Sequence, residues 1–294
     1  ALGAPAVTSG RRPEGKARKK YHNMVLVLPG AALLTMFLFY PLVDVGIRSV
    51  VDPTFTTKNY EWFFTTDVNV AVMRRTFGTA ALVTLVCLLI SYPYAYLMTI
   101  VGSRMRALMF MVVLIPLWTS LMIRTLAWVV LLQDTGLIND ALEAVGLSRL
   151  ALIRTTTGVA IGMTQVLLPF MVLPLYSVLS KIDRRLLLAA ASMGARPVTA
   201  FRTVYLPLSR PGIYAGSLTV FVLALGFYII PSLLGSPENT MLSALIAQQI
   251  EGLLQWGRGS AMGIVLLLST FISLGLLMLL AFRDGKGVST EAKS

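Results

Sequence analysis

The sequence contains too few charged residues for an average soluble domain. Asp, Glu, Lys and Arg make up 13% of its 294 residues, whereas hydrophobic residues make up 56%. Average soluble domains carry roughly 25% charged residues. So much apolar surface needs a lipid-like solvent, and the composition therefore predicts an integral membrane protein.

Reactive and metal-binding side chains are also scarce. The chain has one cysteine, Cys87, and one histidine, His22. A single cysteine cannot form an intrachain disulfide, and a single histidine in a basic segment supports neither a catalytic triad nor a histidine metal site. We therefore expect no catalytic residue, no metal site and no cofactor in this chain.

Six apolar stretches are long enough to cross a bilayer. A spanning helix needs about 20 apolar residues, because the hydrocarbon core is about 30 Å thick and a helix rises about 1.5 Å per residue. None shows the alternating pattern of barrel strands, so we expect an all-α integral membrane fold. The predicted spans are Met24–Val45, Phe77–Val101, Ala107–Leu132, Gly158–Leu179, Gly212–Leu233 and Ala261–Phe282.

The basic residues predict the orientation of these spans. If both termini are cytoplasmic, the inner segments hold seventeen Lys and Arg residues and the outer segments hold seven, with Arg124 inside a span. This distribution follows the positive-inside rule and gives no single basic face for nucleic acid. We expect a disordered basic tail over residues 1–23, a membrane domain over 24–282 and a second cytoplasmic tail over 283–294.

The loop between the fourth and fifth spans, residues 181–210, is too regular for a simple connection, and we call it the elbow. Asp183 can cap a short helix that Gly194 ends in the left-handed conformation. Pro197 suits the first turn of a second helix, which we expect to end before Pro207, with the next span starting at Ser209 and Pro211. Such a helix-turn-helix can dock into a groove on a soluble partner, although an ordinary tight loop is the alternative.

The elbow resembles the signature loop of binding-protein-dependent ABC transporter permeases of the type I importers. Their pattern is Glu-Ala-Ala, three residues, Gly, nine residues and Ile-x-Leu-Pro, and the spacing here is the same. Leu188 replaces the glutamate and Val204 replaces the isoleucine. The resemblance implies that eight elbow residues couple the chain to an ATPase: Leu188, Ala189, Ala190, Gly194, Arg196, Phe201, Leu206 and Pro207.

Three further segments look like spermidine/putrescine-type permeases: Ile115–Trp128 with Gly136–Asn139, Leu168–Tyr176, and Phe227–Gly235. This likeness implies an importer in the bacterial inner membrane, made of two permease chains, an ABC ATPase dimer and a periplasmic solute-binding protein. The substrate would be a small solute, a polyamine or related amine, with an opine or an amino-acid derivative as alternatives. Gly285-Lys286 lacks the upstream glycine of a P-loop, so ATP would be hydrolysed by the separate subunit.

Two other classes of protein fit the sequence less well. An ion-driven secondary carrier would need no basic elbow, and no inverted halves are visible. An intramembrane enzyme would need acids or nucleophiles, yet Asp44, at the edge of the first span, is the only carboxylate in the predicted spans.

Four residues are candidates for the translocation path. Arg124 lies within a span, where an unpaired charge is costly, and Asp44 could be its partner. Trp128, Phe227 and Tyr228, and also Trp118, could stack on an amine cation. The alternatives are a structural role for Arg124 and positions facing lipid for the aromatic residues. Two Gly-x-x-x-Gly pairs, Gly158–Gly162 and Gly212–Gly216, predict close helix packing.

Overall fold

The residues that this computed structural model describes, 15–52 and 54–291, are mostly helical and include no strand. The longer helices are α1 (Gly15–Val51), α3 (Asp67–Ile100), α4 (Ser103–Leu114), α5 (Leu121–Leu132), α7 (Thr156–Leu179), α10 (Leu206–Gly226) and α13 (Trp256–Glu291). The shorter ones are α2 (Lys58–Thr65), α6 (Leu137–Ala144), α8 (Arg185–Ser192), α9 (Pro197–Ala200), α11 (Ile229–Leu234) and α12 (Leu242–Ala247). Six helical segments are long and apolar enough to cross a membrane, which confirms the predicted fold class.

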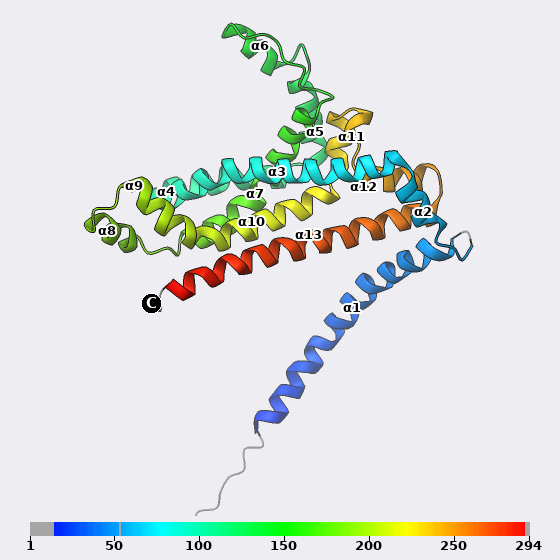
Figure 1. Cartoon of the computed structure of the whole chain (residues 1–294), viewed down its shortest axis with the longest axis horizontal. Coiled ribbons are helices and arrows are strands. Elements are labelled where there is room, and N and C mark those ends of the chain that lie inside the picture. Colours follow the sequence, from blue (N-terminus) through cyan, green and yellow to red (C-terminus); the bar gives the residue numbers. More distant parts are fainter. Residues whose placement is uncertain (1–14, 53, 292–294) are drawn as a thin grey trace, which may run out of the picture.

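The core of the bundle consists of α3, α7 and α10, which pack against one another along their lengths (Figure 1). α7 is the most buried of the three, and Met163, Leu167, Met171 and Leu175 have no exposed surface. Its bounds agree with the predicted fourth span to within two residues. α1 diverges from this bundle, and its described side chains, which lie between residues 29 and 51, are mostly exposed.

Glycines allow α7 and α10 to approach closely. A Cβ atom on Gly216 would lie 2.7 Å from Sδ of Met171, and one on Gly212 would lie 3.0 Å from Cβ of Val178. Protein interiors are too densely packed to absorb such contacts without a shift of the neighbours. The predicted packing role of this Gly-x-x-x-Gly pair is therefore confirmed.

The prediction that the third span, Ala107–Leu132, is a single helix is wrong. α4 ends at Leu114, the 3-10 turn η1 (Ile115–Trp118) follows, and the chain is extended at Thr119 before α5 begins. Pro116 has no N–H group to donate to the carbonyl of Val112, four residues earlier, which weakens the helix at this point. The Thr119 N–H and hydroxyl both donate to the carbonyl of Pro116, at 3.3 and 2.9 Å, and close the turn.

The fifth predicted span also differs from the structure at its outer end. α10 stops at Gly226, and α11 is a separate short helix that contains Pro231. In one continuous helix the Pro231 ring would clash with the carbonyl of Phe227, four residues earlier. The break leaves this carbonyl free, and the Ser243 hydroxyl donates a 2.7 Å hydrogen bond to it.

α9, the π turn η2 (Phe201–Tyr205) and α10 form one continuous helix, so the predicted stop before Pro207 was wrong. The Leu206 N–H donates to the carbonyl of Phe201, five residues earlier. A proline lacks an N–H group and crowds the carbonyl four residues before it. The wider π turn accommodates Pro207 without ending the helix.

The two termini of the described part are also helical. α1 begins at Gly15, inside the segment predicted as a disordered tail, and residues 1–14 lie outside the described residues. α13 continues to Glu291 through most of the predicted second tail. His22 has no described side chain, so its predicted exposure stays a prediction.

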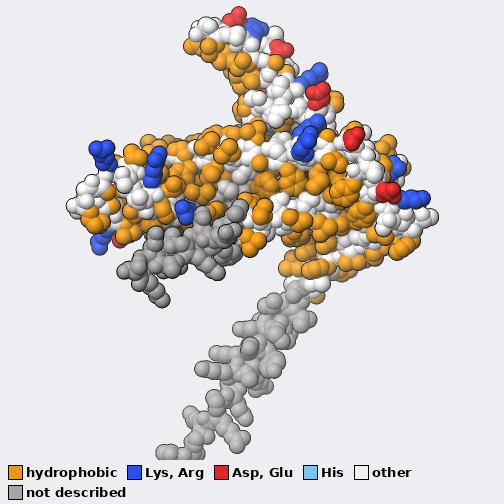
Figure 2. Space-filling model, viewed as in Figure 1, with side chains coloured by type: hydrophobic (Ala, Val, Ile, Leu, Met, Phe, Trp, Pro, Cys, Tyr) orange, Lys and Arg blue, Asp and Glu red, His pale blue; other side chains and the backbone are white. Residues whose placement is uncertain are grey.

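Charged side chains gather at the two ends of the bundle, and apolar side chains cover the surface between them (Figure 2). At the end that carries α8 and α9, residues 101–106 and 181–210 contain eight Lys and Arg residues and one acid, Asp183. The opposite end carries a mixture of acids and bases. This distribution is typical of a protein whose middle lies in lipid.

Because α7 and α10 are in close contact, we expect a larger side chain at Gly216 to destabilise the protein. Gly216→Val places a branched side chain against Met171, and we expect it to lower stability by about 1 to 3 kcal/mol, the usual cost of overpacking. Gly275→Val in α13 is the matched control, because nothing lies within 4 Å of its Cβ position. Thermal unfolding in detergent can be monitored by the reaction of the buried Cys87 thiol with a maleimide dye. The midpoint of unfolding is then compared between the two variants. Equal midpoints for the two variants would contradict the close packing.

Candidate functional site

The elbow folds as the predicted pair of short helices. The Asp183 carboxylate accepts a 2.9 Å hydrogen bond from the Arg185 N–H at the start of α8, which confirms the predicted cap. At its other end the Ala195 N–H donates to the carbonyl of Ala190, and Gly194 has a φ of 86°. This is a Schellman arrangement, which requires the left-handed conformation that glycine adopts without strain.

The eight elbow residues predicted from the resemblance separate into two groups. Leu188, Ala189, Gly194 and Arg196 are exposed on α8 and the turn, so they can contact another protein. Ala190 is buried, and Phe201, Leu206 and Pro207 are half-buried, so they attach the elbow to the bundle. The sequence analysis missed the exposed apolar side chains of Met193 and Val198, because apolar residues beside a basic loop carry no distinctive pattern.

An aromatic cluster joins the elbow to α3. Phe201 and Tyr205 stack on each other with ring centroids 5.6 Å apart, and Tyr96 contacts Tyr205 edge to face at 5.2 Å. Tyr92 contacts Phe201 edge to face, and its hydroxyl lies 3.0 Å from Oγ of Ser209. Aromatic pairs of this geometry contribute about 0.5 to 1.5 kcal/mol each beyond their burial. The elbow is therefore packed against α3 as well as joined to α10.

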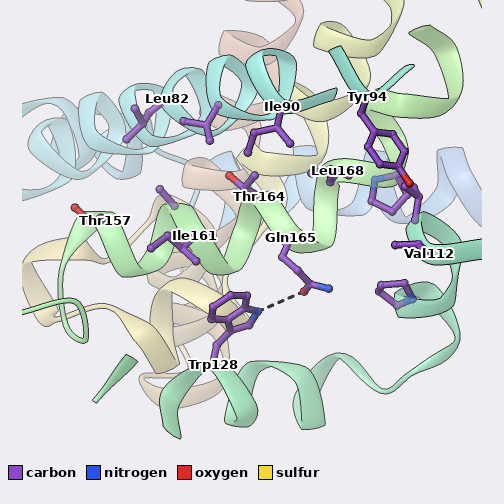
Figure 3. Close-up of a pocket in the computed structure, with 15 residues that line it drawn as sticks. Leu82, Ile90, Tyr94, Val112, Trp128, Thr157, Ile161, Thr164, Gln165 and Leu168 are labelled. Atoms are coloured by element: carbon purple, nitrogen blue, oxygen red, sulfur yellow. Dashed lines mark hydrogen bonds between the residues drawn. The ribbon is translucent and has the colours of Figure 1, made fainter. Parts of the chain in front are cut away.

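A cavity lies between α3, the α4–α5 region and α7, and we call it the bay (Figure 3). Its volume is about 630 Å³. Its residues on α3 and α7 recur every three or four positions and cover about 18 Å along each helix at 1.5 Å per residue. These residues are Leu82, Val86, Ile90 and Tyr94 on α3, and Thr157, Ala160, Ile161, Thr164, Gln165, Leu168 and Pro169 on α7.

Five side chains with polar groups interrupt the apolar lining of the bay: Tyr94, Trp128, Thr157, Thr164 and Gln165. The Trp128 indole N–H on α5 donates a long, 3.5 Å hydrogen bond to Oε1 of Gln165 on α7, and the two side chains face each other across the cavity. The Thr164 side chain is 5% exposed, and its hydroxyl has no hydrogen-bond partner among the described residues. The bay can therefore hold a largely aliphatic molecule and fix it by a few hydrogen bonds and one aromatic face.

The other three predicted path residues do not line the bay. Phe227 packs against the core, and Tyr228 is half-exposed at the start of α11. Arg124 lies on α5 one helical turn before Trp128, and its Nε and Nη1 atoms are buried without a partner among the described residues. The prediction that Asp44 pairs with Arg124 is wrong, because the Asp44 carboxylate forms a 2.7 Å ion pair with Arg48 on the same helix.

Comparisons with known proteins identify relatives over nearly the whole chain. It is 31% identical to the spermidine/putrescine transport system permease protein PotB of Salmonella typhimurium over 281 residues, which are 92% of this chain and 96% of that protein. It is 33% identical to the inner membrane ABC transporter permease protein YdcU of Escherichia coli over 234 residues, 74% of each chain. No protein-family model matches the chain.

A solved structure has the same fold. A chain of a bacterial alginate ABC transporter, in complex with an alginate pentasaccharide-bound periplasmic protein, superposes with a TM-score of 0.73. The superposition covers 95% of this chain and 98% of that one, at 17% sequence identity. An identity this low supports the fold and nothing more specific.

The bay predicts a pattern of thiol accessibility along α7. In a Cys87→Ala background, we expect Ile161→Cys, which lines the bay, to react with a small hydrophilic thiol reagent. Met163→Cys, two residues away and fully buried, should stay unreactive. Labelling of the folded protein in membrane vesicles measures both rates. Equal rates at the two positions would mean that the bay is filled or does not exist.

Proposed function

This chain belongs to the permease subunits of ABC importers that include PotB and YdcU, and we propose that it imports a polyamine or a related small amine. In this family the permease forms the translocation path. The family therefore does not fit the alternative of an ion-driven secondary carrier. The observation that carries the proposal is the bay, which presents an aromatic face and an amide to a long aliphatic space.

The chemistry of the bay suits an aliphatic amine. Methylene groups can pack against the aliphatic side chains of α3 and α7, and an ammonium group can lie over the Trp128 indole. Gln165 and Thr164 offer oxygen atoms to the N–H groups. No carboxylate lines the bay within the described part of the chain, so an opine or an amino-acid derivative remains the alternative substrate, and competition for uptake distinguishes the two.

The partners that we propose follow from the two ends of the bundle. An ATPase dimer would dock on the elbow, where Leu188, Met193 and Val198 expose apolar side chains among basic residues. The excess of Lys and Arg at this end supports a cytoplasmic location for it and for both termini. A second permease would complete the path, and a periplasmic binding protein would deliver the substrate to the opposite end.

The elbow turn provides a test of the proposed coupling. Gly194→Val forces a β-branched residue into a φ of 86°, which strains the turn by about 1 to 3 kcal/mol. We expect weaker co-purification of the ATPase and lower substrate-stimulated ATP hydrolysis, with normal insertion into the membrane. Gly146→Val is the control, since Gly146 has a similar φ of 82° in the loop after α6. ATPase co-purification that is equally strong in both variants would contradict the coupling role.

Uptake of labelled putrescine by the reconstituted importer tests the substrate and the bay together. We expect uptake to require ATP hydrolysis and the binding protein. Trp128→Leu should lower uptake by about 2- to 30-fold, as the loss of a cation–π contact of about 0.5 to 2 kcal/mol implies. Trp118→Leu should leave uptake unchanged, since Trp118 is 92% exposed and lies outside the bay. Absence of ATP-dependent uptake, or equal losses in the two variants, would refute the proposal.

A further inference from the structure

A second, smaller cavity lies beneath the elbow, where α3 and α7 end. Its volume is about 310 Å³. The ends of the two spans contribute Thr99, Ile100 and Leu179, and the elbow contributes Arg184 and Leu188. The cavity therefore lies at the boundary between the apolar middle of the bundle and its basic end.

Two polar groups of this cavity have unused hydrogen-bonding capacity. The Arg184 guanidinium donates a hydrogen bond to the carbonyl of Thr99, but it carries five N–H groups, so most remain available. Tyr205 is 3% exposed. Its hydroxyl forms no hydrogen bond with the described residues, although Thr99 and Arg184 lie nearby. A buried hydroxyl without a hydrogen-bond partner lowers stability. A hydroxyl beside a cation is well placed to donate a hydrogen bond to an anion.

Among the described residues, no carboxylate forms an ion pair with Arg184. Asp183 uses its carboxylate to cap α8 through the Arg185 N–H, and no acid lines the cavity. Leu188 follows Arg184 by one helical turn, at the position where the family pattern has glutamate. Residues four apart on a helix are neighbours, so a glutamate there would pair with Arg184. The leucine therefore leaves the cavity positively charged.

We propose that this cavity binds the phosphate group of an anionic phospholipid, with Arg184 and the Tyr205 hydroxyl as the donors. The acyl chains would leave along Ile100, Leu179 and Leu188, which give the site an apolar side that a free phosphate does not need. Basic pockets between transmembrane helices at the cytoplasmic surface hold lipid headgroups in this manner. The inference goes beyond the proposed function and depends on it only for the leaflet that supplies the lipid.

A lipid in this position would connect the elbow to the membrane. Arg184 already joins the start of α8 to the end of α3 through Thr99. A phosphate held by Arg184 and Tyr205 adds a contact to η2, the π turn that leads into α10. The lipid composition of the bilayer would then affect how rigidly the elbow is held.

Native mass spectrometry of the intact importer tests the site, with nanodiscs containing dioleoylphosphatidylglycerol in a phosphatidylcholine background. We expect phosphatidylglycerol to be retained, and Arg184→Gln to weaken its retention by at least about tenfold, because a charge-assisted hydrogen bond is lost. Leu188→Glu should have a similar effect, since it supplies the missing counter-ion. Arg184→Lys should retain part of the binding. Arg185→Gln is the matched control and should bind like the unmodified protein, because Arg185 does not line the cavity.

Three outcomes would overturn the inference. Equal losses in Arg184→Gln and Arg185→Gln would show attraction to surface charge without a built site. Equal retention in all variants would place the lipid elsewhere. Displacement of the lipid by inorganic phosphate would assign the cavity to a free anion.

Putrescine uptake in the same samples tests the proposed function separately, since lipid can bind whether or not amines are transported. A monodisperse gel-filtration profile confirms that each variant is folded.

Discussion

The structure depends on one constraint, that every backbone N–H and C=O group inside a membrane must find a partner within the protein. Regular helices satisfy this constraint automatically, whereas prolines break it, since each removes a donor and leaves a carbonyl without a partner. At Pro231 the chain satisfies the freed carbonyl of Phe227 through the Ser243 hydroxyl, and at the other break the Thr119 N–H and hydroxyl both bond the carbonyl of Pro116. Its irregular points are therefore stable features of the fold, and each of them shapes a candidate functional region.

These breaks separate the packed core from the walls of the bay. α7 and α10 pack closely at the glycines of α10, and the break after Pro116 lets α5 leave the core and form the far wall of the bay. At the other end, the π turn carries the elbow helix into α10 without an interruption. The aromatic cluster ties the same turn to α3. The elbow turn is therefore in contact with α3 and continuous with α10, the two core helices that pack along α7.

Sequence patterns predicted the features that depend on local chemistry. Hydropathy located α7 to within two residues, and the elbow turn followed from the left-handed preference of Gly194. Hydropathy could not detect the breaks at Thr119 and Phe227, because apolar residues continue through both. The partner of Arg124 was predicted wrongly, since Arg48 lies one turn from Asp44 and forms the ion pair locally. The bay depends on the register of α3 against α7, which no single-helix pattern encodes.

The charge balance of the bay bears on how the importer is assembled. An ammonium group in a low-dielectric cavity needs a nearby anion, and an aromatic face offsets only part of the cost of desolvation. Among the described side chains, no carboxylate lines the bay, and Asp44 is already paired with Arg48. Arg124, one turn from Trp128, adds positive charge to this region. If the substrate is a cation, the opposing surface of the path must therefore supply the negative charge. That requirement would make the two halves of the path chemically unequal wherever this chain faces a cationic substrate.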